Sequence, residues 1–574
     1  MIKYYMVLFL ILCSTRIIPQ ELTRQQLDKM FNDFMKIRNV NTTLKTGSNK
    51  EYIKCGFSQA NSVRIHFNSF TLEQQQILKP LFARPILQTS IVSPSGFFRI
   101  HYDTTGTNAP KFYTTDDLLH YSVSDLIQIY VDSVAIAADS SYNFEVNYIG
   151  FPAPPPDNGA GGDDKYDIYI ANLSGLGEYG ETDFEFVSSN DKGPSFMLLN
   201  SDFTGFPTLG IFAARVTVAH EFNHGIQVGS YIYRDSDAWF HELTSTSMET
   251  FVYTSIKDYY NYLSTYFDNP DRSIAENNLG AGDGYDLAIW NIFQRDKFGY
   301  GIIKRDWELM PSERAIVAIN QAIMEKGSLF SEALNEFGVR VFYTNYRAQY
   351  APSGKKFIEG ENYPLISYTT SLTLPPYNTI NGTCFPTSNN YIKMIIHLPG
   401  DIDTLASIIT NSDYNAASAN SDSLLNFQYQ VSNISFSGSR DVSGKYYTLL
   451  TADKHQFWTD AEILNNLLAD SGVYNNNITD FAFPSPFRYN NPGHVNIYIP
   501  ADANSSGIAI LSIYSISMTL VYSSESIIES PFGHPVIKWT PRNNNNERLS
   551  SGIYIFAVKS GDKVKTGKIV IFNE

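Results

Sequence analysis

A His-Glu-x-x-His motif at residues 220–224 constrains this 574-residue chain more than any other stretch. Two histidines four residues apart leave the same face of an α-helix, one turn from each other. This spacing allows His220 and His224 to bind one zinc ion at about 2.0–2.1 Å each. Glu221 stands beside the metal in such a helix, where it can accept a proton from a zinc-activated water. Apolar residues flank the motif on both sides, so we expect a buried helix.

A catalytic zinc site needs a third protein ligand and leaves its fourth position open. Glu242 follows His224 by eighteen residues, a separation that suits a second helix returning antiparallel to the first. Glu242, Thr246 and Glu249 would share one face of that helix. We therefore predict Glu242 as the third ligand. Glu249 is either a second carboxylate that supports a ligating histidine or a rival ligand.

The two segments together resemble the gluzincin metallopeptidases, which include thermolysin and a family of zinc aminopeptidases. The resemblance rests on His-Glu-x-x-His at 220–224 and on Trp-x-x-Glu at 239–242, and it implies that Glu242 binds zinc. The wider surroundings resemble a family of secreted bacterial metalloproteases from about Cys55 to about residue 350. Its marks in this sequence are residues 93–102, residues 161–169, the zinc helix and residues 239–249.

The same resemblance suggests how the oxyanion is held. In gluzincin aminopeptidases a Tyr at the start of a later helix donates a hydrogen bond to the tetrahedral oxyanion. Tyr285 opens an apolar helix at the matching place, and a phenol aimed at developing charge is a suitable electrophile. His241 is the alternative donor.

The charge of the chain argues against nucleic-acid binding. It carries 42 Lys and Arg against 58 Asp and Glu, for a net charge of −16, and it has no basic tract. Such a chain would repel phosphate. A Gly-x-Ser-x-Gly elbow is also missing from the sequence, which leaves serine hydrolase chemistry without a signature.

The N-terminus predicts export. Lys3 precedes about ten apolar residues, a pattern typical of a signal peptide over residues 1–19. We expect no transmembrane span in the mature chain, which would be secreted or held on the cell surface. Residues 20–90 are either a prosegment that shields the site or part of the catalytic domain. Cys55 and Cys384 would remain after cleavage, and they could form one disulfide outside the cytoplasm.

Residues 91–350 are predicted to form the metallopeptidase domain, a small sheet with a helical zinc site. Residues 97–102, 143–149 and 166–170 are predicted strands, and residues 123–138 a helix. Asp163, Asp164 and Asp167 lie beside glycines, where they either form a solvated acidic turn or bind Ca²⁺.

Two β-rich domains are predicted to follow. Residues 360–470 alternate as a β-sandwich would, and residues 480–574 contain short, regularly spaced strands typical of an immunoglobulin-like sandwich. The Pro-x-Pro-Phe at 484–487, Trp539 and the Ser-Gly-Ile-Tyr at 551–554 resemble the C-terminal sorting domain of type IX secretion substrates. That resemblance implies the secretion machinery as a partner. The predicted fold class is thus a multidomain α+β protein.

Three functions agree with these patterns. The first is a secreted zinc endopeptidase that cleaves a protein or peptide substrate, with Glu221 as general base. The second is a zinc aminopeptidase, which would carry an acidic Gly-x-Met-Glu-Asn-type motif before residue 220; this sequence has none. The third is a cell-surface adhesion or binding protein with a non-catalytic zinc site, although a purely structural site has no need of Glu221.

Overall fold

The structure is a computed structural model. It describes residues 22–38, 53–114, 116–185, 192–276, 284–374, 379–398, 401–420, 424–430, 482, 484–490, 494–502, 507–516, 518–529, 535–561 and 563–573. The predicted signal peptide at 1–19 and most of residues 421–481 lie outside the described residues. Within the described ranges, no helix combines the length and the apolar character needed to cross a membrane. The architecture is mixed α+β with several sheets, as the sequence predicts.

Three helices form the N-terminal segment: α1 (Arg24–Ile37), α2 (Phe57–Ile65) and α3 (Leu72–Leu78). The hydroxyls of Thr23 and Thr71 cap α1 and α3 and complete a capping box in each. The three helices bury a small hydrophobic core of their own. Its members are Leu27, Phe34, Met35, Ala60, Val63, Phe70 and Leu78.

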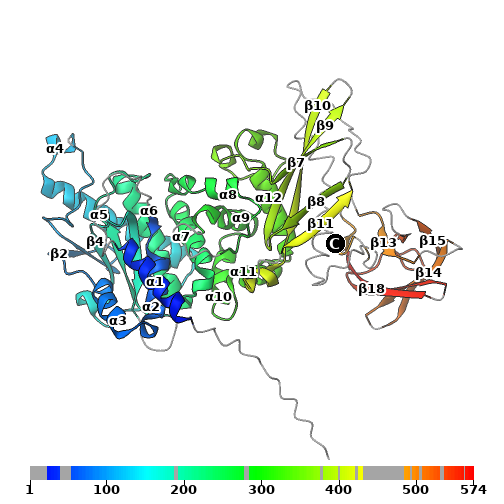
Figure 1. The fold of residues 1–574 in the computed structure, drawn as a ribbon, viewed down its shortest axis with the longest axis horizontal. Helices are drawn as coiled ribbons and strands as arrows, with labels where there is room; N and C mark the ends of the chain where they lie inside the picture. Colours follow the sequence, from blue (N-terminus) through cyan, green and yellow to red (C-terminus); the bar gives the residue numbers. More distant parts are fainter. Residues whose placement is uncertain are drawn as a thin grey trace, which may run out of the picture.

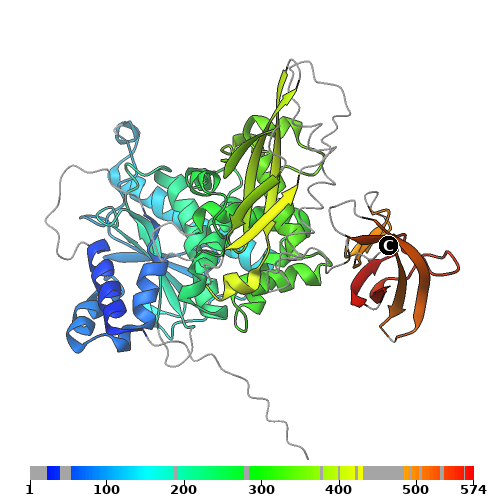
Figure 2. The ribbon, with the colours of Figure 1, turned by 45° about the vertical axis from the view of Figure 1, so that its right-hand side comes forward.

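The first sheet has six strands in the order β1-β5-β6-β4-β3-β2. The strands are β1 (Ile53–Cys55), β2 (Thr89–Val92), β3 (Phe98–Tyr102), β4 (Tyr166–Ala171), β5 (Glu178–Phe184) and β6 (Ser195–Asn200). β1 pairs in parallel with β5, while β5 and β6 are antiparallel. Figure 1 and Figure 2 show the blue N-terminal helices beside this sheet.

The predicted strand at residues 143–149 is wrong. After α4 (Asp117–His120), helix α5 (Val123–Tyr142) continues as a π-helix through Asn143–Ile149 and ends at Gly150. Glu145 and Ile149, four residues apart, are the buried residues of this turn, so helical spacing rather than alternation sets its inner face.

A helical layer follows in the chain, and its first helix lies directly on the sheet. Its helices are α6 (Gly210–Ile226), α7 (Ala238–Val252), α8 (Ser264–Asp268), α9 (Ala288–Phe298), α10 (Gly301–Leu309), α11 (Ala315–Glu325) and α12 (Phe330–Phe342). α6 lies across β5 and β6, and α7 packs on the other side of α6. The main core of the protein, with Phe222, Trp239, Trp290 and Phe337 among its members, fills this layer.

The next strands form a three-stranded sheet, β10-β9-β7, and a two-stranded sheet, β11-β8. They are β7 (Thr370–Leu374), β8 (Thr379–Cys384), β9 (Ser388–Leu398), β10 (Asp401–Asn411) and β11 (Leu425–Gln430), with α13 (Tyr414–Ser418) between the last two. α12 packs against β9 and β10. Tyr391 and Ile408 belong to the same core as the helical layer.

The C-terminal residues form a seven-stranded sheet in the order β12-β18-β17-β14-β15-β16-β13. Its strands, orange to red in Figure 1, are β12 (Phe487–Arg488), β13 (Ile497–Pro500), β14 (Ile508–Ser515), β15 (Leu520–Glu529), β16 (Val536–Trp539), β17 (Gly552–Ser560) and β18 (Lys563–Phe572). Alternate residues of β14 and β17 point into a separate core around Trp539 and Phe556.

Candidate metal centre

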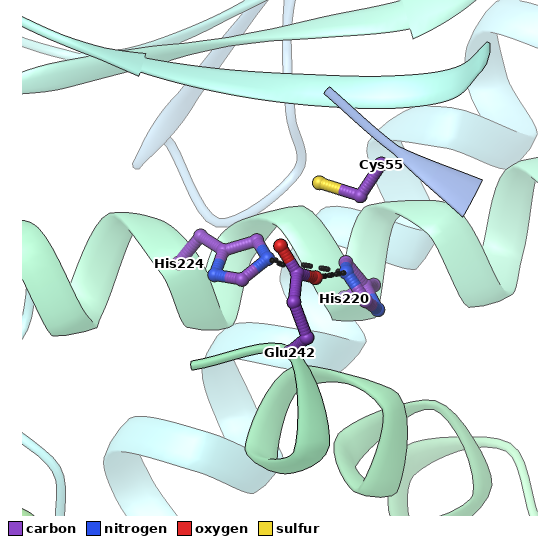
Figure 3. A group of neighbouring side chains, drawn as sticks. All are labelled: Cys55, His220, His224 and Glu242. Carbon is purple, nitrogen blue, oxygen red and sulfur yellow. Dashed lines mark hydrogen bonds and ion pairs between the residues drawn. The ribbon is translucent and has the colours of Figure 1, made fainter. Parts of the chain in front are cut away.

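Four donor side chains from three elements meet beside the first sheet. Cys55 comes from β1, His220 and His224 from α6, and Glu242 from the first turns of α7 (Figure 3). One donor atom from each lies within 4.8 Å of the others, and all four residues are buried. The described part of the chain holds no second group of this kind.

Two glycines allow the elements to approach so closely. A Cβ at Gly180 of β5 would lie 2.6 Å from Thr217 Cγ2 and 3.0 Å from Glu221 Cγ, so only glycine lets α6 pack this near the strand. Gly284 has φ +100°, and a Cβ there would lie 2.1 Å from the Trp239 carbonyl oxygen. Both positions require glycine.

The three predicted ligands face one another across a small gap. His220 Nε2 lies 3.1 Å from His224 Nε2, and each lies 3.2 Å from Glu242 Oε2. Donors held at bonds of about 2.0–2.3 Å around a tetrahedral ion are separated by roughly 3.5 Å. The spacing is therefore close to what one small ion requires.

The hydrogen bonds of His220 fix its tautomer. Its Nδ1 lies 2.8 Å from Glu249 Oε1, a carboxylate that can only accept, so this nitrogen carries the proton. Lys54 Nζ donates to the other oxygen of Glu249 at 3.0 Å. Glu249, the sequence-based rival ligand, thus lies on the far side of His220 from the gap and orients its ring.

His224 is held in the same tautomer by an amide. The Gln227 side-chain nitrogen lies 2.6 Å from Asn223 Oδ1 and 3.1 Å from the His241 carbonyl oxygen, so its oxygen faces the histidines. His224 Nδ1 lies 2.9 Å from Gln227 Oε1 and therefore donates to it.

When both histidines are neutral, these tautomers leave both Nε2 lone pairs facing the Glu242 carboxylate, an arrangement that either a proton or a metal cation between them would satisfy. Burial alone would lower the pKa of His220, but hydrogen bonds to Glu242 and Glu249 outweigh it and raise that pKa to about 9. Burial opposes ionisation of Glu242, yet the two imidazoles hold its pKa well below the usual range. The pocket favours positive charge, and two imidazoles, a carboxylate and a thiol suit a borderline-soft divalent ion.

Glu221 lies beside the donors and is not one of them. Thr182 Oγ1 donates to Glu221 Oε2 at 2.8 Å and also reaches the Glu221 carbonyl oxygen. Burial raises the pKa of this carboxyl, while His220 and His224 lower it in part. The group is thus positioned and suited to hold a proton.

Tyr285 and His241, the predicted oxyanion donors, have different surroundings. The Tyr285 hydroxyl lies 3.4 Å from the Cys55 carbonyl oxygen, next to the donor group. His241 Nδ1 lies 2.8 Å from Gln227 Oε1 and must donate to it, and burial holds its pKa well below the usual range. Its Nε2 is then a lone pair, which does not fit the predicted role of a donor.

The acidic turn predicted as a possible calcium site is already paired with protein cations. Asp163 accepts from Arg99 and Lys165, and Asp167 forms an ion pair with Arg84 and a hydrogen bond with His101. Asp163, Asp164 and Asp167 belong to no metal-binding group among the residues the structure describes.

Sequence reasoning missed the role of Cys55. The possible disulfide to Cys384 is not formed, because both cysteines are free and buried. The sequence did carry a signal for one supporting residue, because Gln227 follows His224 by three positions on the same helical face. No sequence signal links Cys55 to residues 220–242.

Comparison with known proteins adds little to this geometry. No family model and no curated protein matches the chain. Two solved structures, both from Porphyromonas gingivalis, match short parts of it. PorZ, an essential bacterial surface component of the type-IX secretion system, is 22% identical over 16% of this chain and 11% of its own, with a TM-score of 0.12. Dimeric latent PorU is 16% identical over 30% of this chain and 12% of its own, with a TM-score of 0.14. This chain therefore spans only about an eighth or less of each of those proteins.

Proposed function

We propose that this chain is a secreted, zinc-dependent endopeptidase with a gluzincin-like catalytic domain. The observation that carries the proposal is the convergence of His220, His224 and Glu242 with a buried carboxylate, Glu221, that is not needed as a ligand. A structural site would require only the ligands.

The residues divide the chemistry among them. His220, His224 and Glu242 would hold zinc, with Glu249 and Gln227 fixing the two imidazoles. A bound zinc ion supplies Lewis-acid polarisation of a carbonyl and lowers the pKa of water. Glu221 would accept the proton of the attacking water and pass it to the leaving amine; the raised pKa that burial gives this carboxyl suits both transfers.

Tyr285 would stabilise the charge that develops on the substrate carbonyl oxygen. Its hydroxyl already points at a peptide carbonyl oxygen, that of Cys55, beside the donor group. A donor in this position becomes more effective as negative charge grows.

A second candidate function, a surface-binding protein with structural zinc, is favoured by one observation. Cys55 supplies a fourth protein donor, and closed four-donor sites are typical of structural zinc. The aminopeptidase alternative has no such support. Export would rest on the predicted signal peptide at 1–19 and on the C-terminal strands as a sorting domain for type IX secretion.

The decisive variant is Glu221→Gln. Purified chain would be tested by elemental analysis and by casein hydrolysis with and without a chelator, before and after proteolytic cleavage in the region preceding residue 90. We expect one equivalent of zinc in both proteins, and at least about a hundredfold lower hydrolysis by the variant. Glu325→Gln, at an exposed position of α11, is the matched control. Equal hydrolysis by Glu221→Gln and the parent would refute the general-base role, and a zinc-loaded parent that hydrolyses nothing after cleavage would favour the structural site.

A further inference from the structure

The strand that carries Cys55 lies at the edge of the first sheet. β1 pairs only with β5, with Cys55 opposite Gly180. Figure 3 shows the Cys55 sulfur on the β1 side of His220, His224 and Glu242, and the donor atoms of all four residues lie within 4.8 Å of one another. A thiol loses its proton when it binds a metal ion and is then a strong ligand. Cys55 would thus occupy the fourth position that a catalytic zinc ion keeps for water.

The residues after Cys55 cover the other side of the donors. The Phe57 ring stacks on the His224 ring, with centroids 3.8 Å apart and planes within 7°. Ser58 Oγ donates to Glu242 Oε1 at 2.7 Å. In this arrangement the segment from β1 to the start of α2 covers the metal centre, where His220, His224 and Glu242 are at most 3% exposed.

Lys54 fills a pocket of opposite charge next to the centre. Its ammonium donates to Glu249 Oε2 at 3.0 Å and also pairs with Asp258. It lies 4.6 Å from the centroid of the Tyr179 ring and 5.7 Å from that of Tyr262. Lys54 is only 1% exposed, so two carboxylates and two aromatic faces enclose one cation.

The N-terminal segment that carries β1, residues 22–86, has both apolar and ionic contacts with the rest of the chain, and Cys55 and Phe57 share a buried cluster with Phe184, Tyr233 and Tyr285. Its helices have their own hydrophobic core. Several of its contacts with the catalytic domain are ionic: Arg38 pairs with Glu178 and Glu181, and Arg64 with Asp183. Because β1 is an edge strand, its loss would leave the other five strands paired.

We propose that residues 53–58 are an intramolecular inhibitor of the metal centre. In it, Cys55 supplies the fourth metal ligand and Lys54 occupies a cation-binding pocket. Once the N-terminal segment dissociates, this pocket binds a Lys or Arg side chain of the substrate. This inference rests on the proposed peptidase function. The pocket residues Tyr179, Glu249, Asp258 and Tyr262 all lie outside the segment. Two buried carboxylates left without Lys54 need another cation, so a basic peptide side chain is the chemistry that fits.

The first experiment tests the ligand without measuring activity. The full chain is loaded with Co²⁺, whose bond to a thiolate gives a charge-transfer absorption in the near ultraviolet. We expect this absorption in the parent and in Cys384→Ala, the matched control at the other buried free cysteine. Cys55→Ala should lose it while retaining one equivalent of cobalt. A parent without the absorption, or a Cys55→Ala variant that keeps it, would overturn the inference.

The second experiment tests displacement and specificity. A recognition sequence for a site-specific protease is placed at Ile86, which is 99% exposed. After cutting, the residues before the cut are separated by chromatography in the lowest denaturant concentration that releases them. We then expect the thiolate absorption to disappear, the metal to remain, and Lys- or Arg-containing peptides to be hydrolysed at least about tenfold faster than Leu analogues. Asp258→Asn should reduce that preference, and Glu325→Gln should not.

The outcomes distinguish failure of the inhibitor proposal from failure of the peptidase proposal. Any of three results would overturn the inhibitor proposal: the thiolate absorption persists after the segment is removed, the metal leaves together with the segment, or Lys and Leu peptides are hydrolysed at equal rates. Loss of the absorption with retained metal, but no hydrolysis of any peptide, would refute the peptidase and still support a displaceable thiolate ligand.

Discussion

The metal centre and the C-terminal sheet use buried space differently. Around the centre, Lys54, Glu221, Glu249 and Asp258 are buried, and each meets an ionic or hydrogen-bonding partner. Among the described residues from 482 to 573, by contrast, no charged side chain is buried, and Ser560 is the one buried polar residue. One region is held by paired charges and the other by apolar area.

The difference determines how each region should respond to change. A buried charge is tolerated only while its partner remains, so removing one side chain leaves an uncompensated group. An apolar core loses stability in proportion to the area and volume removed, without regard to metal or pH. Metal content, salt and pH should therefore act on the first region and leave the second unchanged.

Loss of a metal ligand should produce the largest effect. Glu242→Gln keeps the shape of the side chain but removes the charge that faces both Nε2 atoms. We expect zinc affinity to fall roughly a thousandfold, since four ligands share about 10–16 kcal/mol of binding free energy. Competition with a chromophoric chelator measures this fall. Glu325→Gln should bind zinc as the parent does, and an unchanged affinity in Glu242→Gln would remove that residue from the ligand set.

Breaking the buried ion pairs of Lys54 should have the second-largest effect, a loss of folding stability. Lys54→Met leaves Glu249 and Asp258 without their cation and should cost about 3–5 kcal/mol in the free energy of unfolding. The matched control is Lys29→Met, because the Lys29–Asp33 pair lies on the exposed face of α1 and should contribute little. Denaturant titration gives both values, and equal values would mean that burial does not distinguish the two pairs.

An apolar truncation in the C-terminal sheet should act locally. Phe556→Ala empties a fully buried position in β17 and should destabilise that sheet by about 3–5 kcal/mol. Amide hydrogen exchange in β17 and β18 reports the loss, and the zinc content should stay at one equivalent. Ile553→Ala, at a half-exposed position of the same strand, is the control and should cost much less. Zinc loss in Phe556→Ala would show that the two regions are coupled.

Replacing Asp306, a buried carboxyl that is hydrogen-bonded to an amide, should have the smallest effect, a gain in stability. Burial raises the pKa of Asp306, and a hydrogen bond from Gln294 offsets this only in part. The folded protein then holds the proton more tightly than the unfolded chain, so stability falls as pH rises above about 3.9. Asp306→Asn should match the parent near pH 4 and be more stable at pH 7–8 by about 1 kcal/mol, or roughly 1–2 °C in Tm. Melting curves across this range test the prediction; a gain that does not depend on pH would contradict it.

Regular, local patterns were the predictable part of the fold. The alternation at residues 97–102 and 166–170 corresponds to β3 and β4, and the apolar face at 123–138 to α5. The strand prediction for residues 143–149 failed because the apolar residues Phe144, Val146 and Tyr148 alternate by chance with other residues, while Glu145 and Ile149 face the core. The hydrogen bond from Asn223 to Glu145 that accompanies the helical turn is invisible to a periodicity argument.

The helix that carries His220, Glu221 and His224 was predictable from the residues alone, because spacing within one helix is a local property. Glu242 was predictable too, since its distance along the chain suits the next helix, and Gln227 shares a helical face with His224. The positions of Cys55 beside these ligands and of Glu249 between His220 and Lys54 follow from the packing of separate elements. The physical reason is that these contacts depend on β1 pairing with β5 and on α7 packing against α6, and such pairings leave no periodic trace in the residues that make them.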